Sequence, residues 1–119
     1  MRKSVFRNLA IGWLAVVSLA PAQTPWYSVG PFVISELKSD WTPSEGILVV
    51  PPAGVTIPNP GSCAATDGAG LSSSNPAYKT QSAMLLAAFL SGKQVRIWFN
   101  NTSGCAINRP AMIGVDVLK

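Results

Sequence analysis

The chain of 119 residues contains no histidine and only two cysteines, and only 12% of its residues are charged. Without histidine, the Ser-His and Cys-His nucleophilic pairs and the commonest general base are excluded. Two cysteines without histidine also cannot form a four-ligand zinc site. No glycine-rich phosphate loop occurs, and the five scattered acidic residues single out no acid–base pair. The composition therefore predicts a binding or assembly protein that is not an enzyme and that holds no metal or cofactor.

The N-terminal segment has the three parts of a secretory signal peptide. Arg2, Lys3 and Arg7 give it positive charge, residues 9–19 form an apolar run, and residues 20–22 read Ala-Pro-Ala. Small residues there suit signal peptidase, and the run is shorter than the roughly 20 residues of a transmembrane helix. We expect residues 1–22 to be removed and 23–119 to form one secreted or periplasmic domain without a membrane span.

Removal of the signal peptide changes the charge of the protein. The full chain carries nine basic and five acidic residues, a net charge of +4. Loss of the three basic residues of the signal leaves six against five, a net charge of about +1. The electrostatic attraction on which nucleic acid binding depends is then nearly absent, so we expect no nucleic acid partner.

Cys63 and Cys105 are the only thiols and lie 42 positions apart. An even count in an exported chain favours one internal disulfide. The spacing differs from the Cys-x-x-Cys of a redox pair. We therefore predict a structural Cys63–Cys105 bridge, which would stabilise the domain by about 4 kcal/mol on the chain-entropy model.

Hydrophobic patterning predicts five strands and one helix. Alternating or β-branched residues indicate the strands, the third being the weakest, at residues 31–39, 47–50, 64–66, 94–100 and 111–118. With the helix between the third and fourth strands, the order is strand-strand-strand-helix-strand-strand. This order predicts an all-β protein with one helix, a β-barrel of the OB-fold type. A split α+β sheet has the same order and stays an alternative.

The helix is expected to begin at Pro76 and to run to about Leu90. Asn75 suits the N-cap, Pro76 suits the first helical position, and Gly92 can adopt the left-handed conformation that ends a helix. One apolar face should pack on the core, through Ala77, Met84, Leu85, Ala88 and Phe89.

The strand at residues 94–100 has two distinct faces. Val95, Ile97 and Phe99 are expected in the core, and Arg96 and Trp98 alternate with them on the opposite face. A tryptophan beside an arginine on such a face can be a ligand platform, a subunit contact or a residue covered by a loop. We therefore mark Arg96 and Trp98 as a candidate interface.

Two stretches of the chain resemble the B subunit of subtilase cytotoxin, in the family of pertussis-like AB5 toxin B subunits. The first is Trp26-Tyr27-Ser28 followed by Val33-Ile34-Ser35-Glu36-Leu37, and the second is Ser91-Gly92-Lys93-Gln94-Val95-Arg96-Ile97. The resemblance implies an OB-fold that assembles as a homopentamer. It also implies binding to cell-surface glycans, often ending in sialic acid, and docking of a separate catalytic A subunit.

The resemblance places a ligand site at Trp26, Tyr27 and Ser28, because in that family the serine of the aromatic-aromatic-Ser stretch takes part in sialic acid binding. A hydroxyl can hydrogen-bond the sugar, and an aromatic ring can pack on its apolar face. The alternative is an N-terminal segment that only seals the barrel.

The sequence therefore predicts a glycan-binding, B-subunit-like module. The first alternative is a secreted or periplasmic protein-interaction module of the same fold without sugar binding, in which Arg96 and Trp98 form the interface. A third hypothesis, single-stranded nucleic acid binding, follows from the fold class alone.

Overall fold

The computed structural model describes residues 25–39 and 46–119, so the predicted signal peptide lies outside the described residues. The elements are β1 (Trp26–Val33), β2 (Glu36–Ser39), β3 (Gly46–Val50), β4 (Ala69–Ser72), α2 (Tyr78–Ser91), β5 (Gln94–Asn100), β6 (Cys105–Ala106), β7 (Arg109–Pro110) and β8 (Gly114–Val117). Over these residues the protein is therefore mostly β-structure with one helix, which confirms the predicted class. Across these two ranges, no helix has the length and hydropathy needed to cross a bilayer.

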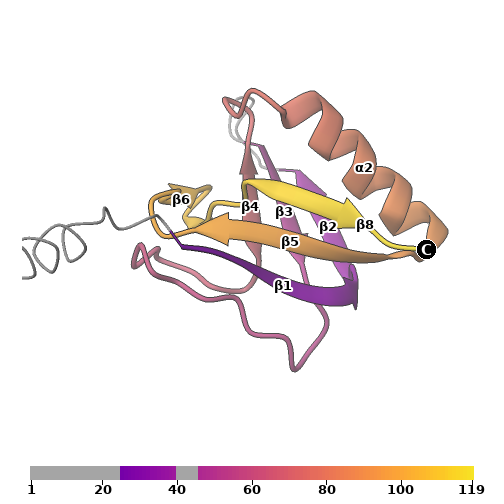
Figure 1. The fold of residues 1–119 in the computed structure, drawn as a ribbon, viewed down its shortest axis with the longest axis horizontal. Coiled ribbons are helices and arrows are strands. Elements are labelled where there is room, and N and C mark those ends of the chain that lie inside the picture. The colour runs from indigo at the N-terminus through magenta and orange to yellow at the C-terminus, as the bar shows by residue number, and fades with distance from the viewer. Residues whose placement is uncertain (1–24, 40–45) are drawn as a thin grey trace, which may run out of the picture.

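The strands form two three-stranded antiparallel sheets, ordered β1-β5-β8 and β2-β3-β4, and a small β6-β7 hairpin (Figure 1). β1 and β2 belong to one stretch of chain that leaves the first sheet and enters the second at Ile34 and Ser35. At this corner, the Ser35 N–H donates to the Val50 carbonyl at 2.9 Å. A single parallel bridge, Gly70 with Ala111, connects β4 to the segment before β8. The described strands do not form a closed barrel.

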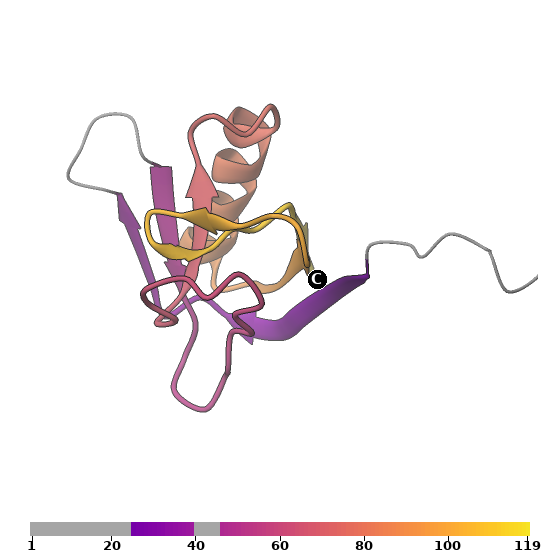
Figure 2. The same ribbon diagram turned by 90° about the vertical axis from the view of Figure 1, so that its left-hand side faces the viewer.

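The hydrophobic core lies between the two sheets. Its most deeply buried strand residues are at most 1% exposed: Val49, Ala69, Leu71, Val95, Ile97 and Phe99. Helix α2 covers one side of this core through Leu85 and Ala88, and the long loop between β3 and β4 adds Ile57 (Figures 1 and 2). Each large apolar side chain removed from water in this way contributes about 1.5–3 kcal/mol.

Helix α2 ends as predicted but begins later. Gly92 adopts a left-handed conformation, with φ of 68°, and its N–H group bonds to the last turn of the helix. The N-cap is Ala77 and not Asn75. The Asn75 Oδ1 instead accepts a hydrogen bond from the Ala77 N–H at 2.8 Å, so this side chain stabilises the turn that precedes the helix.

Two strand predictions were wrong in position, and the last predicted strand, at residues 111–118, is shorter in the structure, where β8 spans Gly114–Val117. The first strand begins at Trp26 and not at residue 31, because a β-bulge between Val29 and Phe32 accommodates the cis-linked Gly30 and Pro31 inside the strand. The third strand is Ala69–Ser72, and residues 64–66 belong to the preceding loop.

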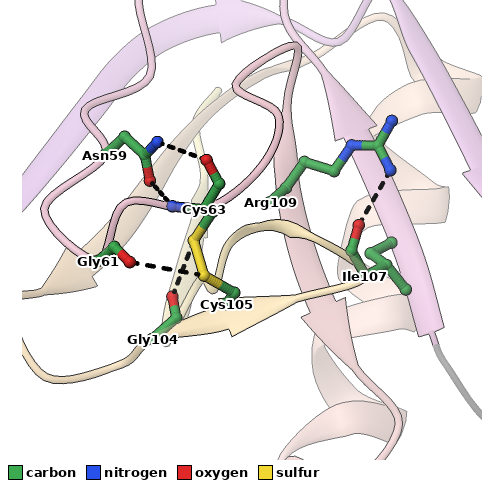
Figure 3. The surroundings of a disulfide bond; sticks show 7 residues. All are labelled: Asn59, Gly61, Cys63, Gly104, Cys105, Ile107 and Arg109. Carbon is green, nitrogen blue, oxygen red and sulfur yellow. Dashed lines mark hydrogen bonds between the residues drawn. A yellow bond between two sulfur atoms is a disulfide. The ribbon is translucent and has the colours of Figure 1, made fainter.

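The predicted disulfide is present. The Cα atoms of Cys63 and Cys105 lie 5.7 Å apart, and their bond joins the loop before β4 to the β6-β7 hairpin (Figure 3). Two further links join the same segments: a two-pronged ion pair between Arg109 and Asp67, at 2.8 and 3.1 Å, and a hydrogen bond from the Ala65 N–H to the Asn108 carbonyl. The loop and hairpin thus form one cross-linked unit, which we call the disulfide clasp.

Candidate functional site

The three residues of the predicted ligand site lie on both faces of strand β1. Because side chains alternate along a strand, Trp26 and Ser28 point to the face of the β1-β5-β8 sheet that is turned away from the core. We call this the outer face. Tyr27 points the opposite way and stacks on Phe99, with ring centroids 5.6 Å apart. The structure therefore brings Trp26 and Ser28 together and separates Tyr27 from them.

Tyr27 lies beneath the long loop between β3 and β4. Its ring, with Pro58, Asn59, Pro60 and Asn101, lines a shallow pocket of about 410 Å³. The hydroxyl is buried without a hydrogen-bond partner, and burial raises the pKa of the Tyr27 phenol above its usual value. The ring therefore contributes to packing, while its polar atom is left unsatisfied.

The predicted interface residues lie beside Ser28 on the outer face. The strand register places Ser28 opposite Trp98, and Trp98 opposite Gly114 on β8. The Trp98 indole N–H donates to Asp116 Oδ2 at 2.8 Å, and Arg96 Nη1 lies 3.7 Å from the same oxygen. One carboxylate thus orients both candidate interface residues.

A groove runs between this outer face and the N-terminal half of α2, with a volume of about 470 Å³. We call it the helix–sheet groove. Its main lining residues are Trp26, Gln81, Met84, Trp98, Ile113 and Asp116. Trp26 is 66% exposed, although a tryptophan is among the residues that gain most from burial. An exposed indole beside a partly apolar groove is typical of a surface that a ligand or partner covers.

Gln81 is a groove residue that the sequence analysis did not identify. It is only 8% exposed and lies among the core-facing positions of α2. Its Nε2 donates to the Ile113 carbonyl at 2.9 Å, whereas its Oε1 has no hydrogen-bond partner. The sequence contained one sign of this residue: Gln81 lies four positions before Leu85, so it falls on the apolar face of the helix although it is polar.

The acidic residues of the described ranges are committed to ion pairs. Glu36 lies 3.6 Å from Lys38, Asp67 bonds Arg109, and Asp116 lies 3.7 Å from Arg96. Within those ranges no three His, Cys, Asp or Glu side chains cluster as metal ligands would. Of these acidic residues, Asp116 belongs to the outer face, where it contacts Arg96 and Trp98.

No protein-family model matches the chain, and no curated protein matches it. The resemblance to toxin B subunits accordingly stays a prediction that rests on the two stretches quoted above.

Proposed function

We propose that the protein is an exported, non-enzymatic recognition module that binds glycans through the outer face of its β1-β5-β8 sheet. The observation that carries this proposal is the 66% exposure of Trp26, on the same strand face as Ser28. An exposed indole can pack on the apolar face of a sugar ring, while a neighbouring hydroxyl hydrogen-bonds its polar groups. Trp98, held by Asp116, adds a second aromatic surface that is already oriented.

We further propose that the fold is of the OB type. Three features support this: the continuous stretch that passes from β1 to β2 through Ile34 and Ser35, the position of the helix between β4 and β5, and the parallel bridge of Gly70 with Ala111. That bridge, together with the Met112 N–H bond to the Gly70 carbonyl at 2.9 Å, joins the open sides of the two sheets.

Assembly into a homopentamer that docks a catalytic A subunit belongs to the same proposal. Exposed apolar residues on α2 support the proposed assembly. Leu86, Phe89 and Leu90 are 49%, 37% and 74% exposed. Their spacing of three and four residues places them on one side of the helix, and we propose that a second copy of the chain covers them. The mass of the exported protein in solution tests assembly: a pentamer supports the ring, and a monomer contradicts it.

The glycan proposal is tested by binding of the exported protein to an array of sialylated and neutral glycans. We expect Trp26→Ala and Ser28→Ala to weaken binding at least tenfold without lowering thermal stability, because both side chains are exposed. Lys93→Ala, at an exposed position beyond the helix, is the control and should bind as the wild type does. Absence of binding to every glycan by folded protein would refute glycan recognition.

A protein-interaction module is the second candidate function, and the fixed geometry of Arg96 and Trp98 favours it. Arginine and tryptophan are both enriched at the hot spots of protein interfaces. In this protein, Asp116 orients both side chains before a partner binds. Under this alternative, Trp98→Ala would abolish capture of a protein from the native host, and the glycan array would stay negative.

A further inference from the structure

We infer that the helix–sheet groove binds a neutral pyranose, an uncharged sugar ring that donates hydrogen bonds through its hydroxyls. This inference rests on the proposed glycan recognition and names the class of sugar that the groove accepts. It differs from binding of sialic acid, whose carboxylate needs hydrogen-bond donors or positive charge.

The shape and lining of the groove suit one sugar ring. Its volume of about 470 Å³ falls within the roughly 300–1,000 Å³ typical of small-molecule sites. Indole rings from Trp26 and Trp98 line it, together with the apolar side chains of Met84 and Ile113. The C–H groups on one face of a pyranose pack on such aromatic surfaces, while its hydroxyls remain free for hydrogen bonds.

The polar atoms of the groove select a ligand that donates hydrogen bonds. The Gln81 amide is fixed in orientation because its Nε2 donates to the Ile113 carbonyl, which leaves Oε1 as an unpaired acceptor. A buried acceptor without a donor is unfavourable, so a ligand hydroxyl that reaches it gains a hydrogen bond that the free protein lacks. Met84, whose flexible side chain lines the groove beside Gln81, can move to admit that hydroxyl.

The charge of the groove favours a neutral ligand. Asp116 is the charged residue among those that line it, and its carboxylate accepts hydrogen bonds. A hydroxyl can donate to this carboxylate, whereas the carboxylate of a sialic acid would be repelled by it, although Arg96, 3.7 Å from Oδ2, weakens that repulsion. An uncharged, hydroxyl-bearing sugar is therefore complementary to the groove.

Gly114 provides a position at which a side chain can be introduced to block the groove. A Cβ at this position would lie 3.5 Å from the Trp98 Cβ, an ordinary van der Waals distance, so the backbone tolerates a side chain there. Gly114→Val suits a strand and should fill part of the groove with its methyl groups. Thr80→Leu, on the helical wall, is a second blocking variant, and Ala87→Leu, at an exposed helical position away from the groove, is its matched control.

The experiment is a titration of the ¹⁵N-labelled exported protein with the methyl glycosides of galactose, glucose, mannose and N-acetylglucosamine, and separately with sialyllactose. We expect at least one methyl glycoside to shift the side-chain amide signals of Gln81 and the indole N–H signal of Trp98. Gly114→Val and Thr80→Leu should weaken that binding at least tenfold, and Ala87→Leu should not. If Gly114→Val fails to fold, the comparison of Thr80→Leu with Ala87→Leu tests whether the groove is the binding site.

The remaining outcomes separate this inference from the proposed function. Glycoside binding that survives both blocking variants would overturn the groove as its site. Binding of sialyllactose that shifts Ser28 but not Gln81, without any methyl glycoside binding, would overturn the groove inference and leave glycan recognition standing. If neither the glycosides nor sialyllactose nor any array glycan binds, both proposals fail.

Discussion

Trp98 and Asp116 are joined across neighbouring strands by a hydrogen bond of 2.8 Å from the indole N–H to Oδ2. The same carboxylate oxygen lies 3.7 Å from Nη1 of Arg96, directly opposite Asp116 in the strand register. The indole therefore keeps one orientation on the outer face before any ligand arrives. Such pre-organisation reduces the entropy lost on binding.

We predict that Asp116→Ala destabilises the fold by about 1 kcal/mol, because it removes a hydrogen bond to a charged but partly exposed group. The indole should also become more mobile, with a shift of its fluorescence to longer wavelength. Urea unfolding and fluorescence measure the two effects. Asp116→Asn keeps an acceptor for the indole and is the control: equal losses in both variants would show that this hydrogen bond is unimportant.

We predict that replacing both cysteines of the disulfide clasp by alanine lowers the free energy of unfolding by about 4 kcal/mol, as expected for the long loop that the bond closes. Urea unfolding under oxidising conditions measures the loss, and wild-type protein with reductant should fall to a similar stability. Alkylation of unfolded, unreduced wild-type protein should detect no free thiol at Cys63 or Cys105. Two reactive thiols would contradict the bridge.

The ion pair of the clasp predicts a pH dependence of stability. The Arg109 guanidinium bonded to Asp67 lowers the pKa of that carboxyl below its usual value. Because the folded pKa is lower than the unfolded one, ionised Asp67 stabilises the fold above its unfolded pKa, and this contribution is lost as pH falls through the folded pKa. The Asp67 side chain is 54% exposed, so screening limits the effect to less than about 1 kcal/mol.

Asp67→Asn should accordingly reduce stability at neutral pH and should match the wild type at pH values below the folded pKa of Asp67. Urea unfolding at several pH values measures this. Glu36→Gln, which removes an ion pair between two exposed side chains, is the control and should leave stability unchanged. A constant difference between Asp67→Asn and wild type at every pH would contradict the assignment.

We predict that Gly70→Ala destabilises the protein by about 1–3 kcal/mol, because its methyl group would overlap the backbone carbonyl of Ala106 and force β4 away from β6. Thermal unfolding measures the loss. Gly61→Ala is the matched control, since a Cβ there meets Gly104 at an ordinary 3.6 Å. A Gly70→Ala protein as stable as the control would mean that the two segments are not packed this closely.

Removal of the unpartnered hydroxyl of Tyr27 should not harm the fold. Tyr27→Phe keeps the ring that stacks on Phe99 and removes a buried polar atom without a hydrogen bond, so we predict unchanged stability or a gain of up to about 1 kcal/mol. Thermal unfolding is the measurement. A loss of more than about 1 kcal/mol would show that the hydroxyl has a partner in solution, such as an ordered water.

The sequence predicted the elements whose local pattern agrees with their environment in the fold. β5 occupies its predicted residues, 94–100, with Val95, Ile97 and Phe99 in the core, because strict alternation and β-branched residues favour a strand with one buried face. The disulfide followed from the cysteine count and the predicted export, and the end of α2 followed from Gly92.

The failures lie where distant contacts override local propensity. β4 combines three small residues with Leu71, and the burial of Gly70 depends on close approach of the β6-β7 hairpin, which no local pattern indicates. Gly30 and Pro31 are typical of a turn, yet β1 continues past them through a bulge. Phe89 was expected in the core and is 37% exposed, whereas Gln81 is buried. The helix–sheet groove could not be predicted, because it depends on how α2 lies across β8.

The position of Trp26 has a practical consequence for handling the protein. This residue starts strand β1, pairs with Asn100 and lines the helix–sheet groove, so a purification tag fused ahead of it would be attached at the rim of the groove. The C-terminal end is a safer place, since the Leu118 N–H bonds the carbonyl of Gln94, at the opposite end of β5. About 20 Å of strand separates the two ends of β5, so a tag after Leu118 lies far from Trp26. Because Asp116 also lines the groove, a flexible linker should separate that tag from β8 in immobilised assays.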